Sequence, residues 1–176
     1  WADFGGGGFK EIQPGTSRLQ GGVPFDIIDP AKNGDKSCLV LKGLKRPNFP
    51  EGVTGIPVNA KVNAFYFLVT SMYAKPGASA KYVFHYGNGE TRTFEASTER
   101  DLPDWWLPAA GGDRPNAIVV FARDQRALFL CEVPNPLPTE TVTALDIVSA
   151  GQSIPIIIAV TARKRFDSVV AGAGEQ

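Results

Sequence analysis

Residues 81–96, KYVFHYGNGETRTFEA, carry the pattern that decides the fold of this chain. Aromatic residues recur at every second position, as Tyr82, Phe84 and Tyr86. A period of two indicates a strand with one buried face, so we expect these three rings to pack together in a core. Residues 87–89, Gly-Asn-Gly, follow directly and tolerate the positive φ angles of a tight turn. The stretch therefore predicts a β-hairpin.

Related patterns recur along the rest of the chain. Residues 22–41, GVPFDIIDPAKNGDKSCLVL, predict a strand, a polar turn and a second strand, and residues 117–133 predict a further hairpin. The candidate strands are residues 23–28, 37–41, 55–58, 64–73, 81–86, 91–96, 117–123, 127–133, 141–149 and 156–164. Short strands separated by glycine and proline turns predict an all-β fold, an antiparallel β-sandwich of the jelly-roll type. We expect no helix longer than about two turns.

The size and charge of the chain limit its organisation and its partners. The 176 residues suffice for one domain, which we place at residues 1–166, with residues 167–176 as a C-terminal linker or tail. A chain that starts at Trp1 suggests a fragment or a mature product. Lys and Arg together number 18, as do Asp and Glu, so the net charge is zero and no nucleic-acid partner is expected. The apolar runs are too short for a membrane span, so no membrane partner is expected either.

The two cysteines, Cys38 and Cys131, both lie within apolar strand-like runs. We favour two buried thiols that pack as small apolar groups. A disulfide requires the two strands to be neighbours, which the spacing leaves open. A zinc site is disfavoured because the chain has no Cys-x-x-Cys spacing and one histidine.

Residue patterns typical of catalysis are missing from the sequence. His85 is the single histidine and lies inside a predicted strand, where packing is a commoner role than proton transfer. The sequence has no Gly-x-Ser-x-Gly motif, and the Gly5–Gly8 tract lacks the residues of a phosphate-binding loop. The carboxylates Asp101, Asp104 and Asp113 share one loop, but their spacing does not require them to face each other across a sugar. We therefore expect no enzyme activity, and an independent hydrolase is the weakest alternative.

The long loop of residues 97–116 holds the best candidates for ligand binding. Its two adjacent tryptophans, Trp105 and Trp106, cannot both point into one core, and an exposed indole suits the apolar face of a sugar ring. Polar residues able to bind sugar hydroxyls surround them. The candidate ligand-binding residues are Trp105, Trp106, Asp104, Arg100, Arg114 and Asn116. In the competing interpretation one indole plugs the end of the sandwich and the other covers a sheet edge; a platform on a sheet face, made by Tyr82, Tyr86 or arginines, is a further alternative.

A possible structural calcium site is the one cofactor that the sequence suggests. Asp29, Asn33 and Asp35 supply oxygen atoms in a single turn, which calcium favours. The same residues are common turn formers, and their spacing does not match an EF-hand loop. Both interpretations stay open at this point.

A series of motifs along nearly the whole chain resembles a known family of domains. The stretches that carry the resemblance are residues 1–5, 22–37, 67–68, 82–86, 104–106 (Asp-Trp-Trp), 135–138 (Asn-Pro-Leu-Pro) and 149–156. Together they resemble a galactose-binding-like β-sandwich accessory domain of secreted bacterial polysaccharide-degrading enzymes, similar to carbohydrate-binding modules. Asp35 stands where that pattern usually has glycine, which leaves the calcium interpretation more open.

This resemblance implies a function and a location. It implies a secreted, extracellular bacterial protein and a non-catalytic module. The module would anchor a covalently linked catalytic domain, such as a glycoside hydrolase, to a plant or algal polysaccharide or oligosaccharide. The alternative is a structural β-sandwich spacer that packs against a neighbouring catalytic domain.

Overall fold

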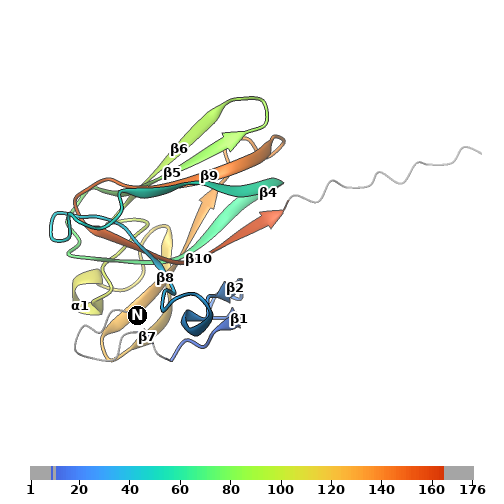
Figure 1. Cartoon of the computed structure of the whole chain (residues 1–176). Coiled ribbons are helices and arrows are strands. Elements are labelled where there is room, and N and C mark those ends of the chain that lie inside the picture. The colour runs from blue at the N-terminus through green and yellow to red at the C-terminus, as the bar shows by residue number, and fades with distance from the viewer. Residues whose placement is uncertain (1–8, 10, 165–176) are drawn as a thin grey trace, which may run out of the picture.

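The computed structural model describes residue 9 and residues 11–164, and these form an almost entirely β-stranded molecule (Figure 1). The elements in chain order are β1 (Gly15–Arg18), β2 (Pro24–Ile27), the 3-10 turn η1 (Pro30–Lys32), β3 (Leu39–Val40), β4 (Gly52–Met72), β5 (Ala78–Tyr86), β6 (Thr91–Ser97), α1 (Leu107–Ala110), β7 (Ala117–Arg123), β8 (Arg126–Pro134), β9 (Thr141–Ser149) and β10 (Ile154–Lys164). Every pairing between these strands is antiparallel. The all-β antiparallel sandwich is thus confirmed. The Gly5–Gly8 tract, the motif at residues 1–5 and the tail at 167–176 lie outside the described residues.

The long strand β4 joins the two layers of the sandwich. Its first part, from Gly52 to Lys61, pairs with β9, and its second part pairs with β8 and β10. One layer is therefore β4-β9-β5-β6 and the other is β3-β10-β4-β8-β7. In Figure 1 β5, β6 and β9 form the upper layer, with β8 and β10 below them. The finer jelly-roll assignment stays a prediction.

Two strands predicted from the sequence, at residues 55–58 and 64–73, are parts of this one strand. The pairing register shifts between Pro57 and Ala60, and Asn59 between them has a φ of 50°. Such a β-bulge interrupts the ladder and bends the strand without reversing the chain. The apolar pattern stops there, but the strand continues.

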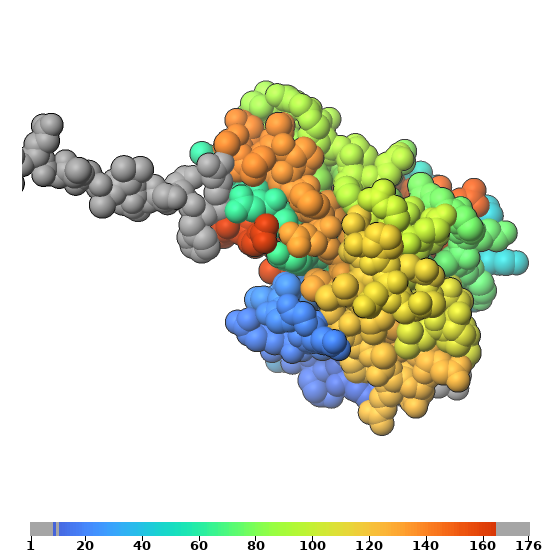
Figure 2. All heavy atoms as spheres, turned by 180° about the vertical axis from the view of Figure 1, so that it is seen from behind, coloured from blue at the N-terminus to red at the C-terminus, as the bar shows by residue number. Residues whose placement is uncertain are grey.

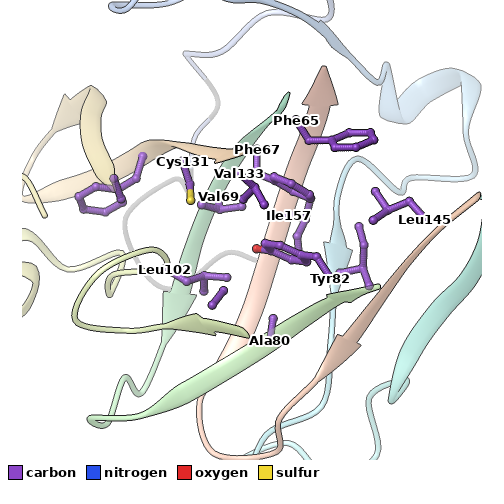
Figure 3. Close-up of a cluster of buried hydrophobic side chains, with 14 of the residues drawn as sticks. Phe65, Phe67, Val69, Ala80, Tyr82, Leu102, Cys131, Val133, Leu145 and Ile157 are labelled. Carbon is purple, nitrogen blue, oxygen red and sulfur yellow. The ribbon is translucent and has the colours of Figure 1, made fainter. Parts of the chain in front are cut away.

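The core between the layers combines aliphatic side chains with several stacked aromatic rings (Figure 3). Tyr82 stacks on Phe67 with ring centroids 4.1 Å apart, and Phe84 stacks on Phe65 at 5.1 Å. Tyr82, Phe84 and Tyr86 are all buried, which confirms the face predicted from their period of two. Burying each such side chain stabilises the fold by about 2 to 3 kcal/mol, so these rings are core residues and the sheet-face platform built on Tyr82 and Tyr86 is wrong.

A second apolar cluster lies on the outer face of the other layer, where the β1–β2 hairpin covers it. Phe25 and Ile27 of β2 are buried there with Leu68, Leu130 and Ile158. Figure 2 shows the blue hairpin against the orange β7–β8 region, and Gly21 beside it lies close to the Leu130 side chain. The two strands predicted within residues 22–41 are both present, as β2 and β3, and they do not pair with each other. β2 pairs with β1, and β3 pairs with β10.

Both hairpins predicted from turn residues are present. At β7–β8, Asp124 and Gln125 have φ angles of 48° and 65°, the two positive values of the tight turn that matches strand twist. At β5–β6, the Gly89 amide donates to the Tyr86 carbonyl at 3.0 Å. These pairings fix the register of both hairpins.

The favoured interpretation of two buried thiols is confirmed for Cys131, whereas Cys38 is only half-buried. Cys131 is buried in the core between the layers, whereas Cys38 packs against the outer cluster, and both are free. Burial raises the pKa of both thiols, which keeps them protonated. No helix in residues 11–164 is long and apolar enough to cross a membrane.

Candidate ligand-binding surfaces

The Asp-Trp-Trp segment is an ordered part of the sheet region and not an irregular loop. The Trp105 amide donates to the Ser71 carbonyl at the end of β4, and the Trp105 carbonyl accepts from Ala127 of β8, both at 2.8 Å. Bridges also join Asp104 to Ser71 and Trp106 to Arg126. The segment therefore lies between two strands and is held on both sides by backbone hydrogen bonds.

Asp104 fixes this corner of the molecule with its side chain. It is 8% exposed, and its Oδ2 accepts from the Ala74 amide at 2.9 Å while its Oδ1 accepts from the Trp106 amide at 3.0 Å. Both oxygen atoms are thus engaged with the backbone. The sequence predicts Asp104 as a direct ligand-binding residue, whereas its burial and its two backbone amides give it a positioning role.

The two tryptophans differ in exposure, so the packing interpretation fits one and the ligand-binding interpretation fits the other. Trp105 is half-buried and packs against the outer apolar cluster. Trp106 is 41% exposed at the start of α1, and the ring centroids lie 5.9 Å apart at an angle of 59°. Trp105 therefore has the packing role, and Trp106 is the ring that a ligand can reach.

Tyr73 adds a second exposed ring that the sequence did not single out. It is 50% exposed and has a φ of 53°, a left-handed conformation that is unfavourable for a large side chain. It directly precedes Ala74, whose amide Asp104 holds. One carboxylate therefore fixes the backbone beside two exposed aromatic rings, those of Tyr73 and Trp106, and the two amides lie within about 8 Å of each other.

Asp101 fixes the other end of the loop in a similar way. It is fully buried, and its oxygen atoms accept from the Ser97 amide and from Nδ2 of Asn116, both at 2.8 Å. The Asn116 amide also donates to the Arg100 carbonyl at 3.0 Å. This network places Arg100 beside Asn116.

Arg114 is a half-buried side chain that packs within the loop. Its guanidinium lies against Gly111, the left-handed residue that ends α1, and its backbone pairs with Ala117 at the start of β7. Its buried Nε has no partner in the described part of the chain. The structure thus gives Arg114 a supporting position rather than a place beside Arg100.

Arg100 and Asn116 line a groove of about 520 Å³. The groove lies where β8 extends past the start of β7, because Cys131 is the last residue of β8 that pairs with β7. The other lining side chains with evident binding chemistry are Tyr66 of β4, Phe94 of β6, Ile118 of β7 and Glu132 of β8. Sequence reasoning missed these four, which come from four strands, and no local pattern marks them.

The six predicted site residues therefore do not form one site. Trp106 bridges to Arg126 at the turn end of the β7–β8 hairpin, whereas Asn116 precedes Ala117, which pairs with Cys131 at the other end. Five residues of an extended strand separate these points, about 16 Å. The loop thus supplies two separate surfaces, an aromatic corner (Tyr73, Asp104 and Trp106) and the groove.

The proposed calcium ligands have roles in shaping their turn. Asp29 caps η1 by accepting from the Ala31 amide at 3.1 Å and pairs with Lys32, and Asn33 donates to the Lys36 carbonyl. Asp35 has a φ of 60°. Among residues 9 and 11–164, no group of three or more His, Cys, Asp or Glu side chains could hold a metal ion. The calcium site stays a prediction that this geometry does not support.

His85 forms a hydrogen bond with Asp146 on the outer face of its layer. Its Nε2 lies 2.7 Å from Oδ2 of Asp146, whose Oδ1 accepts from the Gly55 amide at 2.7 Å. Burial on its own raises the pKa of Asp146, but the Gly55 amide and His85 together bring it below its ordinary value. The pair links β5 and β9 to Gly55, which lies at a second register shift of β4, between Val53 and Ile56. This is a structural role.

Comparison with known proteins gives no relative: the chain matches no family model, no curated protein and no solved structure.

Proposed function

We propose that this chain is a non-catalytic carbohydrate-binding module that anchors a covalently linked enzyme of a secreted bacterial system to a plant or algal polysaccharide. The observation that supports this proposal is the aromatic corner. Trp106 and Tyr73 present large apolar faces to solvent, although exposed rings of this size normally pack in a core.

The chemistry of these rings suits a saccharide. A sugar ring has an apolar C–H face, which stacks on an aromatic ring, and a rim of hydroxyl groups. Asp104 holds the backbone on both sides of the corner, so little conformational entropy is lost when a ligand binds. One or two stacked rings correspond to dissociation constants of roughly 10 to 1000 μM.

The test is affinity electrophoresis of the 176-residue chain on a panel of neutral and acidic polysaccharides, combined with a glycan array. Trp106→Ala removes the more exposed of the two indole rings, together with its contact to Trp105. We expect at least a tenfold loss of retention on the retarding polysaccharide. Phe49→Ala is the matched control, because Phe49 is 37% exposed in a different loop. Retention that is unchanged in Trp106→Ala, or lost equally in Phe49→Ala, contradicts the assignment of the corner.

The alternative, a structural spacer, uses the same exposed rings as a contact surface for a neighbouring catalytic domain. In that case a folded, monomeric chain is retarded by no polysaccharide. This outcome overturns the carbohydrate-binding proposal.

A further inference from the structure

We propose that the groove beside Arg100 is a second binding site, separate from the aromatic corner, and that it takes a saccharide unit carrying a negative charge. The inference rests on the proposed function only in that the ligand is a saccharide. It is carried by the contacts of the charged groups in the groove.

The carboxylate in the groove is already engaged. Glu132 pairs with Arg163 at 3.5 Å, and Arg163 also donates to the Tyr66 hydroxyl at 3.0 Å and lies over its ring at 5.7 Å. Burial raises the pKa of Tyr66, and the Glu132 charge raises it further, so its hydroxyl stays protonated. This side of the groove is therefore balanced in charge.

Arg100 differs from Arg163 in having no such partner. It is exposed, and within the described part of the chain its guanidinium makes no ion pair or side-chain hydrogen bond. Its neighbour Asp101 is fully buried and directs both oxygen atoms to Ser97 and Asn116. Arg100 lines the groove, and its unpaired guanidinium is a planar set of donors that matches a carboxylate or a sulfate in two-point geometry.

The surroundings of Arg100 fit a sugar better than a free anion. Asn116 is held through its Nδ2, so its amide oxygen is directed away from Asp101 and can accept from a hydroxyl group. Phe94 is half-buried, and Ile118 is 43% exposed, so both offer apolar surface to the C–H groups of a ring. A donor fork, an acceptor and apolar walls together correspond to an acidic sugar unit such as a uronic acid.

The experiment compares polygalacturonate with its highly methyl-esterified form, which keeps the sugar rings and removes most of the charge. We expect the 176-residue chain to bind polygalacturonate about tenfold more tightly, and the preference to weaken as NaCl is raised. Arg100→Gln should abolish the preference. Arg46→Gln is the control, because Arg46 is also exposed and, within the described residues, its guanidinium bonds only to the neighbouring Lys45 carbonyl. This variant should leave affinity within about twofold.

Additional ligands distinguish a carboxylate from a sulfate as the bound group, and distinguish this proposal from the carbohydrate-binding proposal. Retention on a sulfated galactan that also depends on Arg100 shows that the site accepts any anionic group; retention on polygalacturonate alone assigns a carboxylate. Equal binding of the acid and the ester, or a preference that survives in Arg100→Gln, overturns the inference. Neutral polysaccharide binding that depends on Trp106 without any acid preference overturns the inference alone, whereas a folded chain retarded by no polysaccharide overturns both proposals.

Discussion

Asp101 and Asp104 lie three positions apart in one loop, and both are buried carboxylates that accept two hydrogen bonds. Asp104 holds two backbone amides, each beside an exposed aromatic ring. Asp101 holds one backbone amide and the side chain of Asn116, beside an exposed cation. The same chemical device therefore supports two surfaces of different character. Buried carboxylates in this loop determine where other residues are placed, and the exposed neighbours determine what can bind.

The largest effect should come from removing the fully buried carboxylate. Asp101→Ala leaves the Ser97 amide and Nδ2 of Asn116 without an acceptor in a site that water does not reach, so we expect a loss of about 3 kcal/mol in the free energy of unfolding. Asp104→Ala should cost less, about 2 kcal/mol, because its site is slightly open. Urea denaturation measures both. If Asp113→Ala, which removes an exposed carboxylate of the same loop, costs as much as Asp101→Ala, burial does not set the difference.

The two tryptophans sharpen the comparison at the aromatic corner. Trp105→Ala removes packing against the outer apolar cluster and should destabilise the fold by about 2 to 3 kcal/mol, whereas Trp106→Ala should cost less than about 1 kcal/mol. Thermal melts of the two variants measure this. Equal losses would show that Trp106 is also part of the packed structure, which would remove the support for its binding role.

Conservative substitutions of Asp104 and Asp101 should affect ligand binding at the aromatic corner and at the groove separately. Asp104→Asn keeps the shape but places an NH₂ group opposite a backbone amide, so we expect retention on neutral polysaccharide to fall about three- to fivefold. Asp101→Asn should instead reduce the preference for polygalacturonate over its ester, because the one amide oxygen cannot serve both the Ser97 amide and Nδ2 of Asn116. Affinity electrophoresis of both variants on both ligands checks this. A similar change in both assays for both variants would mean that the loop acts as one site.

Asp146 lies in β9, away from this loop, and its effect on stability should depend on pH. Its pKa is lower in the folded protein than its ordinary value of 3.8, so it contributes stability above that pH. That stability is lost as pH falls through the folded pKa. We therefore expect the melting temperature of Asp146→Asn to lie below that of the wild type at pH 7 and the difference to shrink below about pH 4. A difference that is independent of pH would assign the effect to shape alone.

The sequence predicted those features that depend on neighbouring residues. The period of two gave the buried face of Tyr82, Phe84 and Tyr86, and the turn residues gave both hairpins. The strand β1 was missed because its four residues, Gly-Thr-Ser-Arg, contain no apolar side chain. Its pairing with β2 depends on the apolar face that β2 buries on the other layer.

The candidate site was predicted less well, for a physical reason. A sequence shows that Asp104 and Asp101 can accept hydrogen bonds, but not that backbone amides already occupy them. The groove is built from four strands and one loop, so no segment carries its pattern. Residue chemistry identified Arg100, Asn116 and Trp106 as exposed or groove-lining candidates, and only the tertiary arrangement divides them between two surfaces.

The strand β4 affects how the molecule unfolds. Because its 21 residues supply hydrogen bonds to both layers, neither layer retains its full ladder when β4 leaves. Cutting the chain between residues 61 and 62 should therefore give fragments that fold only when mixed. In amide hydrogen exchange, β9 of one layer and β8 of the other should be protected to a similar degree, since both lose protection in the same opening event.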